Sequence, residues 1–412
     1  MRLDAVILGG GVAGLWLLDR LSRRGCHVVL LEAHALGAGQ TIASQGIIHG
    51  GLKYTLQGLL TPSARSVRSM PAVWRNSLLG RSAPNLTRTR LRSECCFLWR
   101  TDSLTAWAGM WGARLGLHVK PEPLPPEERP AVLAGVPGMV ARLAEQVICP
   151  ASFLEDLLDQ YRDRILLIDG PDGVRFRLHT PGDIDAVCIT APGGHGSLTL
   201  RPRYVVFTAG AGNAHLRRLA GLDDSTMQRR PLHMTLMRGE LPAFCGHCLD
   251  GARTRVTITS AAAADGSTVW QVGGQVAEDG VTLSPRELTQ HVQSELAQVL
   301  PSLPLAGLHW STYRIDRAEA ATANGGRPET LQVLCAGNVT TGWPTKLALA
   351  PALADEIAAR ISADASSKLF HPGPLADWPR PAVARLPWEE PQREWWTLTG
   401  PNGQGLPQRR AA

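Results

Sequence analysis

The stretch Leu3-Asp4-Ala5-Val6-Ile7-Leu8-Gly9-Gly10-Gly11-Val12-Ala13-Gly14 decides the fold of this 412-residue chain. A short run of β-forming residues ends in a G-x-G-x-x-G sequence, and leucines at helical spacing continue to about Gly25. A second β-branched run, 28–31, is closed by Glu32. The order strand, glycine turn, helix, strand and acidic residue is typical of a dinucleotide-binding unit.

The residues of this unit have separate physical tasks. Gly9 allows the chain to turn sharply off the strand, Gly11 leaves no Cβ between the backbone and a pyrophosphate, and Gly14 lets the helix pack close to the strand. The start of the helix presents backbone N–H groups and positive dipole to phosphate oxygens. Glu32 is placed to accept hydrogen bonds from ribose hydroxyls, and it would repel the extra phosphate of NADP. The predicted dinucleotide contacts are therefore Gly9, Gly11, Val12, Ala13, Gly14 and Glu32.

The composition is that of a soluble globular protein large enough for two cores, with 44% hydrophobic and 19% charged residues. The net charge of +6 is spread along the chain. This favours a mildly basic surface over a nucleic-acid footprint, and it fits anionic substrates or peripheral association with a membrane. No apolar run is long enough to span a bilayer, and the first strand begins too early to leave room for a signal peptide. We therefore expect a cytoplasmic protein.

The eight cysteines are scattered, and one pair has a spacing that metal sites use. Cys245 and Cys248 form a CxxC sequence, but no second pair follows to complete a tetrahedral site. We therefore expect no metal centre.

A loop of small residues, 38–51, follows Glu32 and is well suited to approach a large planar ligand. The loop runs into an expected short helix, and the stretch as far as Tyr54 carries His49, Lys53 and Tyr54. With these residues the chain resembles the FAD-dependent oxidoreductases of the D-amino-acid-oxidase superfamily, which includes glycine oxidase, sarcosine oxidase and D-amino-acid dehydrogenase.

Two overlapping segments carry this resemblance. Ile48-His49-Gly50-Gly51-Leu52-Lys53-Tyr54 is similar to a run in glycerol-3-phosphate dehydrogenases, whereas Gln40-Thr41 and Ser44-Gln45-Gly46-Ile47-Ile48-His49 are similar to 2-hydroxyglutarate oxidases. The resemblance implies that Gln45, Gly46 and Ile47 contact FAD and that His49 faces the substrate. A packing histidine is the alternative for His49. The resemblance also makes Glu32 the ribose ligand of FAD.

Later glycine-ended blocks resemble further cofactor-contacting segments of the superfamily. The run 204–210 reads as a buried strand that ends in Ala209-Gly210, and 333–337 reads as another that ends in Gly337. The segment 342–346 opens an alanine- and leucine-rich helix, whose N-terminus would point at the flavin pyrimidine. Lys346 either adds positive charge there or is a surface lysine. The implied contacts are Ala209, Gly210, Gly337, Gly342, Trp343, Thr345 and Lys346.

The fold class that follows is α/β with an α+β second domain. We expect a Rossmann-like FAD-binding domain with a central parallel sheet, formed by 1–82, 145–226 and 325–365. Alternating patterns such as 229–238 predict a mainly antiparallel β-sheet substrate domain, formed by 83–144 and 227–324. The Pro- and Trp-rich tail, 366–412, either packs back through its aromatic residues or docks a partner.

An anionic substrate needs a cationic anchor, and Arg314 is the first choice. It occupies the place of the carboxylate-binding arginine of the superfamily, although those enzymes usually have Arg-Pro and this chain has Arg314-Ile315. A surface arginine is the alternative. His49 and His233 are the candidate bases.

The leading hypothesis is an FAD-dependent oxidoreductase that dehydrogenates a small anionic substrate by hydride transfer to flavin N5. The substrate would be a 2-hydroxy acid or an amino acid, and the electron acceptor oxygen or a quinone. An NAD-dependent dehydrogenase would explain residues 9–32 but not the blocks at Gly210 and Gly337. A flavin-dependent tRNA-modifying enzyme and a non-catalytic flavin-binding protein are also compatible with the sequence, although no specific nucleic-acid partner is expected.

Overall fold

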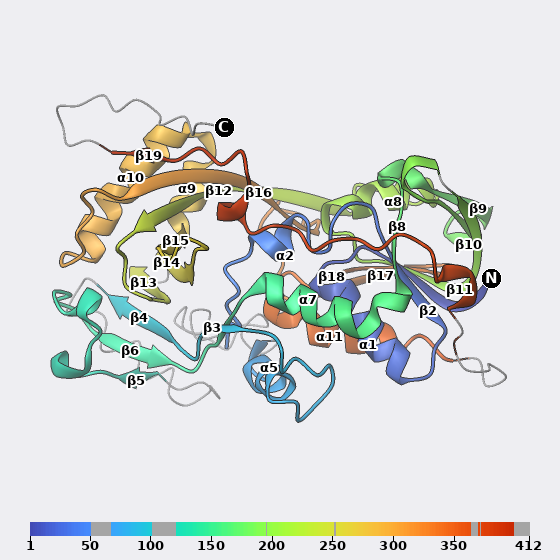
Figure 1. Cartoon of the computed structure of the whole chain (residues 1–412), viewed down its shortest axis with the longest axis horizontal. Helices are drawn as coiled ribbons and strands as arrows, with labels where there is room; N and C mark the ends of the chain where they lie inside the picture. Colours follow the sequence, from blue (N-terminus) through green and yellow to red (C-terminus); the bar gives the residue numbers. More distant parts are fainter. Residues whose placement is uncertain are drawn as a thin grey trace.

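The computed structural model describes residues 1–50, 67–100, 121–194, 196–250, 253–363, 370 and 372–398. Two sheets stand at opposite ends of the molecule (Figure 1). Lys53 and Tyr54, which belong to the segment similar to glycerol-3-phosphate dehydrogenases, lie outside the described residues.

The first sheet is built around the parallel strands β1 (Arg2–Leu8), β2 (Val28–Glu32), β8 (Ile165–Leu167), β11 (Ser197–Phe207) and β18 (Val339–Trp343). Its order is β17-β18-β11-β1-β2-β8, with β17 (Gln332–Ala336) antiparallel at the edge. Strands β9 (Val174–Thr180) and β10 (Asp183–Thr190) extend β11 as an antiparallel excursion.

Both faces of this sheet are buried, as parallel strands require. Ala5 and Ile7 of β1 belong to the core formed with the helices α1 (Val12–Arg23), α7 (Pro150–Tyr161) and α11 (Ala350–Ala358). Val6 and Leu8 alternate to the other face, where they join a second cluster with residues of β9, β10 and α8 (Asn213–Leu219). This near-continuous apolar pattern explains why β1 reads as a buried strand.

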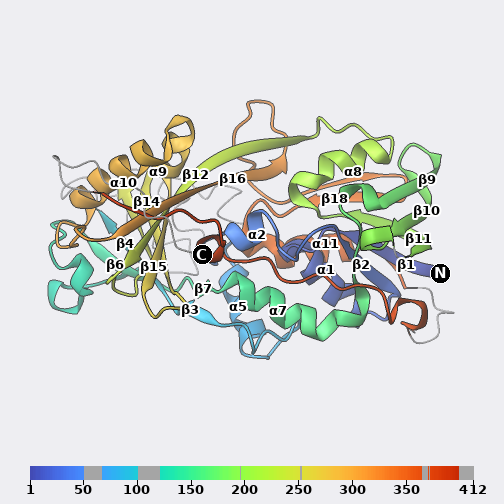
Figure 2. The ribbon, with the colours of Figure 1, turned by 45° about the horizontal axis from the view of Figure 1, so that its top comes forward.

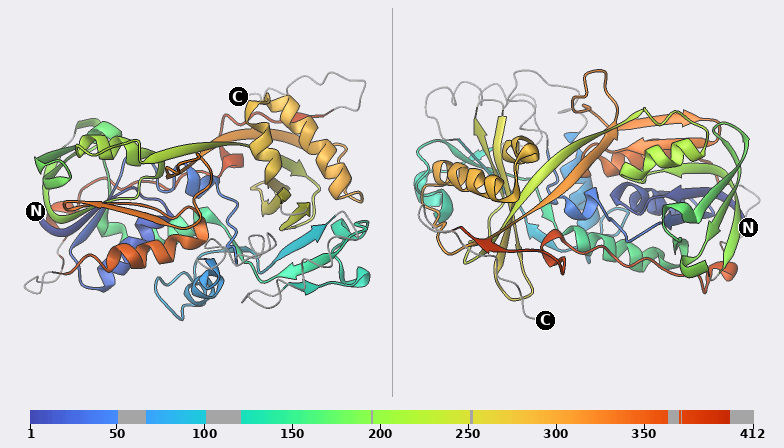
Figure 3. Two further views of the ribbon diagram at one scale, coloured as in Figure 1. Left: turned by 180° about the vertical axis from the view of Figure 1, so that it is seen from behind. Right: turned by 90° about the horizontal axis from the view of Figure 1, so that it is seen from above.

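The second sheet has the order β19-β16-β12-β15-β14-β13-β4-β6-β5, and only the β13–β4 pair is parallel. Its strands are β4 (Cys96–Arg100), β5 (Glu122–Pro123), β6 (Val140–Leu143), β12 (Met227–Gly239), β13 (Gly246–Asp250), β14 (Arg253–Ala262), β15 (Thr268–Gly273), β16 (His309–Ala320) and β19 (Trp396–Thr397). The helices α9 (Gln275–Asp279) and α10 (Pro285–Val299) pack on it. Figure 3 shows the long strands β12 and β16 reaching from this sheet towards the first.

Further short elements lie outside both sheets. These are α2 (Gln40–Ala43), α5 (Met70–Leu78) and the two-stranded pair of β3 (Leu91–Ser93) with β7 (Val147–Ile148). The mixed α/β architecture with one mainly parallel and one mainly antiparallel sheet is confirmed. Strand β19 of the tail pairs with β16 of the second sheet, and the proposed domain boundaries stay a prediction.

The described part of the tail packs back along both sheets (Figure 2). The backbone N–H of Leu167 donates to Pro379 O at 2.9 Å, and the Trp378 indole donates to Leu167 O at 2.7 Å. Further along, Leu36 pairs with Val383 and β19 pairs with β16. Backbone pairing therefore holds this segment as much as its aromatic side chains do. No described helix has the length and apolar character needed to cross a membrane.

Candidate cofactor and substrate site

A cavity of about 1290 Å³ runs from the carboxyl ends of the parallel strands to the second sheet. It is lined by the glycine turn 9–13, by Glu32, by 208–212 after β11 and by 342–347 at the end of β18. The second sheet contributes 314–318 among other residues. Open α/β sheets bind ligands outside the carboxyl ends of their strands, and this cavity has that place.

The glycine turn shows which glycines serve packing and which leave room for a ligand. Gly9 has a φ of +113°, and a Cβ there would lie 2.4 Å from Ala209 Cα. A Cβ on Gly14 would lie 2.0 Å from Gly9 O, so the helix could not sit as close to the strand. A Cβ on Gly11 would meet only Thr41 Oγ1, at 3.1 Å. Gly11 is therefore the glycine whose missing side chain opens the backbone to the cavity.

Glu32 stands at the end of β2 with its carboxylate already oriented. Its Oε2 accepts from Gly10 N at 2.7 Å, and its Oε1 accepts from His34 N at 2.9 Å. Burial raises the pKa of Glu32, although these backbone N–H groups oppose the rise. Each carboxylate oxygen has a second lone pair, so the group can still accept ribose hydroxyls.

The loop after α2 ties the two sheets together. The Gln45 amide donates to Thr257 O at 3.0 Å and to Gln271 O at 2.9 Å, and Gln45 also lines the cavity. Gly46 has a φ of +74°, and a Cβ on this residue would lie only 2.1 Å from Ile148 O. Gly46, like Ile47, which bridges to Val147, lies outside the cavity lining. The structure thus gives Gly46 and Ile47 a packing task, and their expected cofactor contact stays a prediction.

The segment 342–346, which was expected to open a helix, instead contains the end of strand β18. Gly342 and Trp343 close the strand, and the helix α11 begins only at Ala350. Ala209, Gly210, Gly342, Trp343, Thr345 and Lys346 all line the cavity. Lys346 is only 6% exposed, so the alternative of a surface lysine is wrong.

Gly337 does not approach this cavity. It lies in the hairpin between β17 and β18, where a Cβ would sit 2.3 Å from Gly182 O. Because β17 runs antiparallel to β18, the carboxyl end of β17 lies next to the amino end of β18, away from the cavity at the carboxyl ends of the parallel strands. The expectation that the strand ending at Gly337 leads to the cofactor is therefore corrected: β18 does so instead.

The two residues expected from the second sheet are held by its outer helical layer. His233 is 1% exposed and lies outside the cavity lining; its Nδ1 is 3.0 Å from Gly280 O and its Nε2 is 3.0 Å from Thr312 Oγ1. Burial lowers the pKa of His233. These contacts remove His233 from the candidate bases.

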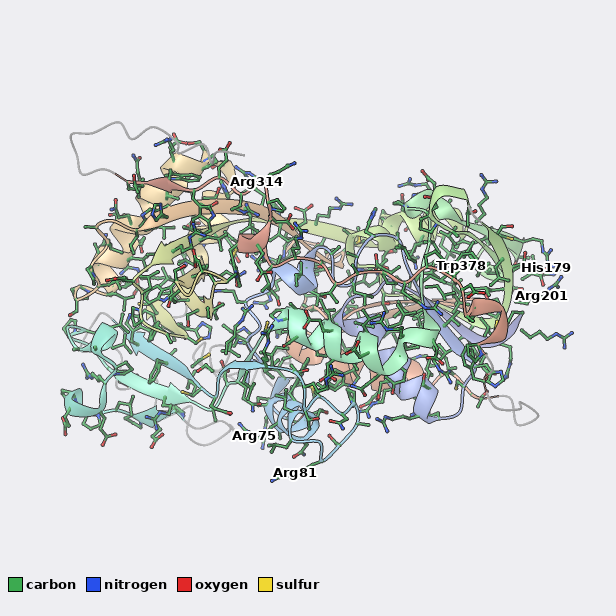
Figure 4. All side chains as sticks on the ribbon, in the orientation of Figure 1. Arg75, Arg81, His179, Arg201, Arg314 and Trp378 are labelled. Atoms are coloured by element: carbon green, nitrogen blue, oxygen red, sulfur yellow. The ribbon has the colours of Figure 1, made fainter. Side chains whose placement is uncertain are left out.

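Arg314 faces the same layer from the neighbouring strand but reaches the cavity wall. It is exposed, and its guanidinium donates to Val281 O at 2.5 Å and to Leu283 O at 2.9 Å (Figure 4). Both interpretations of Arg314 therefore keep structural support, since the side chain is at the surface and also borders the cavity.

His49 lines the cavity and belongs to a cluster with Glu145 and His247. His49 Nδ1 is 3.4 Å and His247 Nε2 is 3.8 Å from Glu145 Oε2. Burial acts to raise the pKa of Glu145, but the two imidazoles outweigh it and hold that pKa below its usual range. Sequence reasoning missed both other members of the cluster. The local pattern of Glu145 carries no functional signal, and the Cys245–Cys248 pair was considered without His247, which stands between the two cysteines.

These residues fit a bound FAD. The opening at Gly11, the oriented Glu32 carboxylate and the small residues at 209–212 face one continuous space. Its volume exceeds the range of about 300–1,000 Å³ usual for ligand pockets, which leaves room for a substrate beside the cofactor.

Comparisons with known proteins agree with this geometry. The family model described as FAD dependent oxidoreductase, DAO, matches residues 4–360. A probable FAD-dependent oxidoreductase of Pseudomonas aeruginosa is 37% identical over 392 residues, covering 94% of this chain and 97% of that protein. The crystal structure of an FAD dependent oxidoreductase from the same organism superposes with a TM-score of 0.76 at 34% identity, covering 94% of this chain and 98% of that one.

More distant structures share the fold. Glycine oxidase from Geobacillus kaustophilus has a TM-score of 0.59 at 16% identity, covering 93% of this chain and 99% of its own. The L-α-glycerophosphate oxidase of Mycoplasma pneumoniae, solved with FAD bound, has a TM-score of 0.60 at 15% identity, covering 90% and 98%. Taken with the family match over nearly the whole length, the dinucleotide turn and the cavity identify the cofactor: the chain belongs to the DAO family of FAD-dependent oxidoreductases.

Proposed function

We propose that this protein dehydrogenates a small anionic substrate, a 2-hydroxy acid or an amino acid, and passes the electrons to oxygen or a quinone. FAD, when bound, supplies the hydride acceptor. The observation that carries the proposal is the charge of the cavity wall on the side of the second sheet, joined to the presence of His49 on the same wall.

Cationic side chains outnumber acidic ones along the cavity. Its lining includes five arginines and one lysine but only three carboxylates: Arg229, Arg253, Arg314, Arg317, Arg327, Lys346, Glu32, Glu278 and Asp316. Two of the carboxylates pair with arginines, Glu278 with Arg317 at 2.5 Å and Asp316 with Arg229 at 3.5 Å. The remaining positive charge favours an anionic ligand.

Within this wall we assign the anchor to Arg314 and keep Arg253 as the second candidate. A guanidinium has five N–H donors, and Arg314 uses two of its nitrogens on backbone carbonyls. The carbonyls hold the group in place, which reduces the entropy that a bound carboxylate must remove.

His49 is the side chain that we assign to accept the substrate proton. The Glu145 carboxylate behind it is anchored by Gly50 N at 2.6 Å and favours a proton on Nδ1. Nε2 of that tautomer is the basic nitrogen, as in other carboxylate-oriented imidazoles.

Anaerobic bleaching of the flavin by a panel of 2-hydroxy acids and amino acids tests the proposal. We expect at least one acid to bleach it, and we expect Arg314→Met to raise the required concentration about 100-fold, the value of a charge-assisted double hydrogen bond near 2.7 kcal/mol. Arg201→Met is a matched control, because Arg201 lies at the surface of the first sheet away from the cavity (Figure 4).

Other outcomes of these measurements would favour a different anchor or a different function. If no acid bleaches the flavin, the protein binds FAD without this activity. If Arg314→Met behaves as Arg201→Met does, the anchor is not Arg314, and Arg253→Met is the next variant. Retention on tRNA that survives 0.2 M salt would favour an RNA-directed enzyme, since non-specific phosphate contacts weaken steeply with salt.

A further inference from the structure

The cluster of His49, Glu145 and His247 offers two imidazole nitrogens and one carboxylate oxygen that lie within 4.8 Å of one another. The three residues come from distant parts of the chain: the loop after α2, the link between β6 and β7, and β13. We propose that this cluster binds one divalent transition-metal ion, with zinc as the first candidate.

The distances separate this proposal from a plain ion pair. A charge-assisted N–H···O⁻ hydrogen bond is about 2.7–2.9 Å long, and these pairs measure 3.4 Å and 3.8 Å. Two ligands held at about 2.0–2.2 Å from one tetrahedral ion lie roughly 3.4 Å apart. The two spacings to Glu145 Oε2 are therefore compatible with ligands that share an ion, and they exceed the usual length of a direct charge-assisted hydrogen bond.

The surrounding groups orient the three ligands. Gly50 N donates to Glu145 Oε1 at 2.6 Å, which leaves Oε2 for the ion. Thr257 Oγ1 lies 2.9 Å from His247 Nδ1, so Nε2 is the nitrogen turned towards the carboxylate. Outer contacts of this kind fix ring orientation and tautomer in metal sites.

The loop and the β6–β7 link are locked together, which keeps the ligands in register. Ile48 N donates to Gln146 O at 2.8 Å, and Ile148 N donates to Gly46 O at 2.9 Å. The segments that carry the three ligands also carry a buried apolar group, which includes Ile47, Val147 and Leu249. Glu145 and His247 are both buried, so the attraction between the carboxylate and a bound cation would be weakly screened.

The donor set selects the class of metal. Magnesium and calcium prefer oxygen ligands, whereas two histidines and one carboxylate bind zinc and iron(II) with open coordination positions. Through His49 the ion would border the cavity and add positive charge to its wall. Bound to the ion through Nδ1, His49 would keep its proton on Nε2, so the role of proton acceptor that we assign to His49 applies to the protein without the ion.

Metal analysis of the FAD-loaded protein, purified without a histidine tag or chelator, tests the proposal. We expect about one zinc or iron per chain by elemental analysis, and the metal found distinguishes the two. After dialysis against a chelator, added Zn²⁺ should bind in a one-to-one ratio by calorimetry and raise the melting temperature. Glu145→Gln and His247→Gln should each weaken this binding at least 100-fold while the flavin content stays unchanged.

His233→Gln is the matched control, since His233 is an equally buried histidine of the second sheet outside the cluster. It should bind Zn²⁺ as the unchanged protein does. Should a cluster variant fail to fold, X-ray absorption at the metal edge of the unchanged protein replaces it and must show imidazole without sulfur ligands.

The proposal is overturned if neither Zn²⁺ nor Fe²⁺ binds in a one-to-one ratio, or if both cluster variants bind as the control does. Thiolate ligation would overturn it as well. Flavin bleaching is measured separately from metal binding. A bound ion would exclude His49 as the proton acceptor but would not exclude the oxidation itself, so failure of the metal site and failure of the proposed oxidation can be told apart.

Discussion

Replacing Gly11 and Gly14 separately by alanine should have two different effects: Gly14→Ala should lower the stability of the fold, and Gly11→Ala should weaken FAD binding. A Cβ on Gly14 would lie 2.0 Å from Gly9 O and 2.8 Å from Thr208 Oγ1, well inside the contact distance of about 3.5 Å. Overpacking of this kind costs about 1–3 kcal/mol, and the upper end applies because the nearest atom is backbone. The better helix propensity of alanine offsets about 1 kcal/mol at most. We expect Gly14→Ala to lower the free energy of unfolding of the apoprotein by about 2 kcal/mol.

Gly11 has a φ of −83° and a ψ of −176°, which alanine adopts without strain. Its added Cβ would press only on Thr41 Oγ1, at 3.1 Å, so the apoprotein should lose about 1 kcal/mol or less. The same methyl group would stand where the backbone opens to the cavity. We expect Gly11→Ala to weaken FAD binding at least 100-fold, about 2.7 kcal/mol.

Urea unfolding of both apoproteins, followed by circular dichroism, gives the stability changes, and titration of flavin fluorescence gives the affinities. The reasoning is refuted if Gly11→Ala destabilises the apoprotein as much as Gly14→Ala does. Flavin affinity of Gly11→Ala within about threefold of the unchanged protein would also refute it.

Three further changes test the links between the site and its supports. Gln45→Ala should lower the stability of the apoprotein by about 1–3 kcal/mol in urea unfolding, because Thr257 O and Gln271 O lose the hydrogen bonds that the Gln45 amide donates. An unchanged midpoint of unfolding would contradict this role in stability. Arg230→Met should cost about 3–5 kcal/mol, because it strands the fully buried Glu319 carboxylate, and a small loss by the same assay would contradict the buried pair. Burial lowers the pKa of His233, so the neutral ring stabilises the fold above pH about 6.5 and that stability is lost as the pH falls. His233→Gln should therefore flatten the decrease in melting temperature between pH 7 and pH 5, and an unchanged slope would show that His233 does not titrate with unfolding.

The residues of the first unit were predictable because their tasks are local. The turn at Gly9 and the approach of helix to strand at Gly14 depend on backbone conformation within one strand–turn–helix unit. The same holds for the alternation that marks β12 and β16, since a period of two follows from strand geometry alone. These features were sufficient for the cofactor and for the two kinds of sheet.

Alternation does not reveal which face of a strand meets the cavity. His233 and Arg314 are paired across β12 and β16 and both bond to the segment 280–283, yet of these two residues Arg314 alone lines the cavity. The sequence pattern likewise did not show which of two successive strands, β17 or β18, has its carboxyl end at the cavity. Two adjacent apolar runs ended in glycine-containing segments, and only the hairpin at Gly337 shows that the second run, β18, is the parallel one.

The sequence by itself determined the glycine turn, the place of Glu32 at the end of its strand and the α/β class, because each arises from neighbours along the chain. Only the tertiary structure brought His49, Glu145 and His247 together, since these residues are about a hundred positions apart and meet where the two sheets join. A pattern along one strand specifies its own conformation and its buried face. It does not specify which distant side chains share that buried space, because that depends on how the sheets pack.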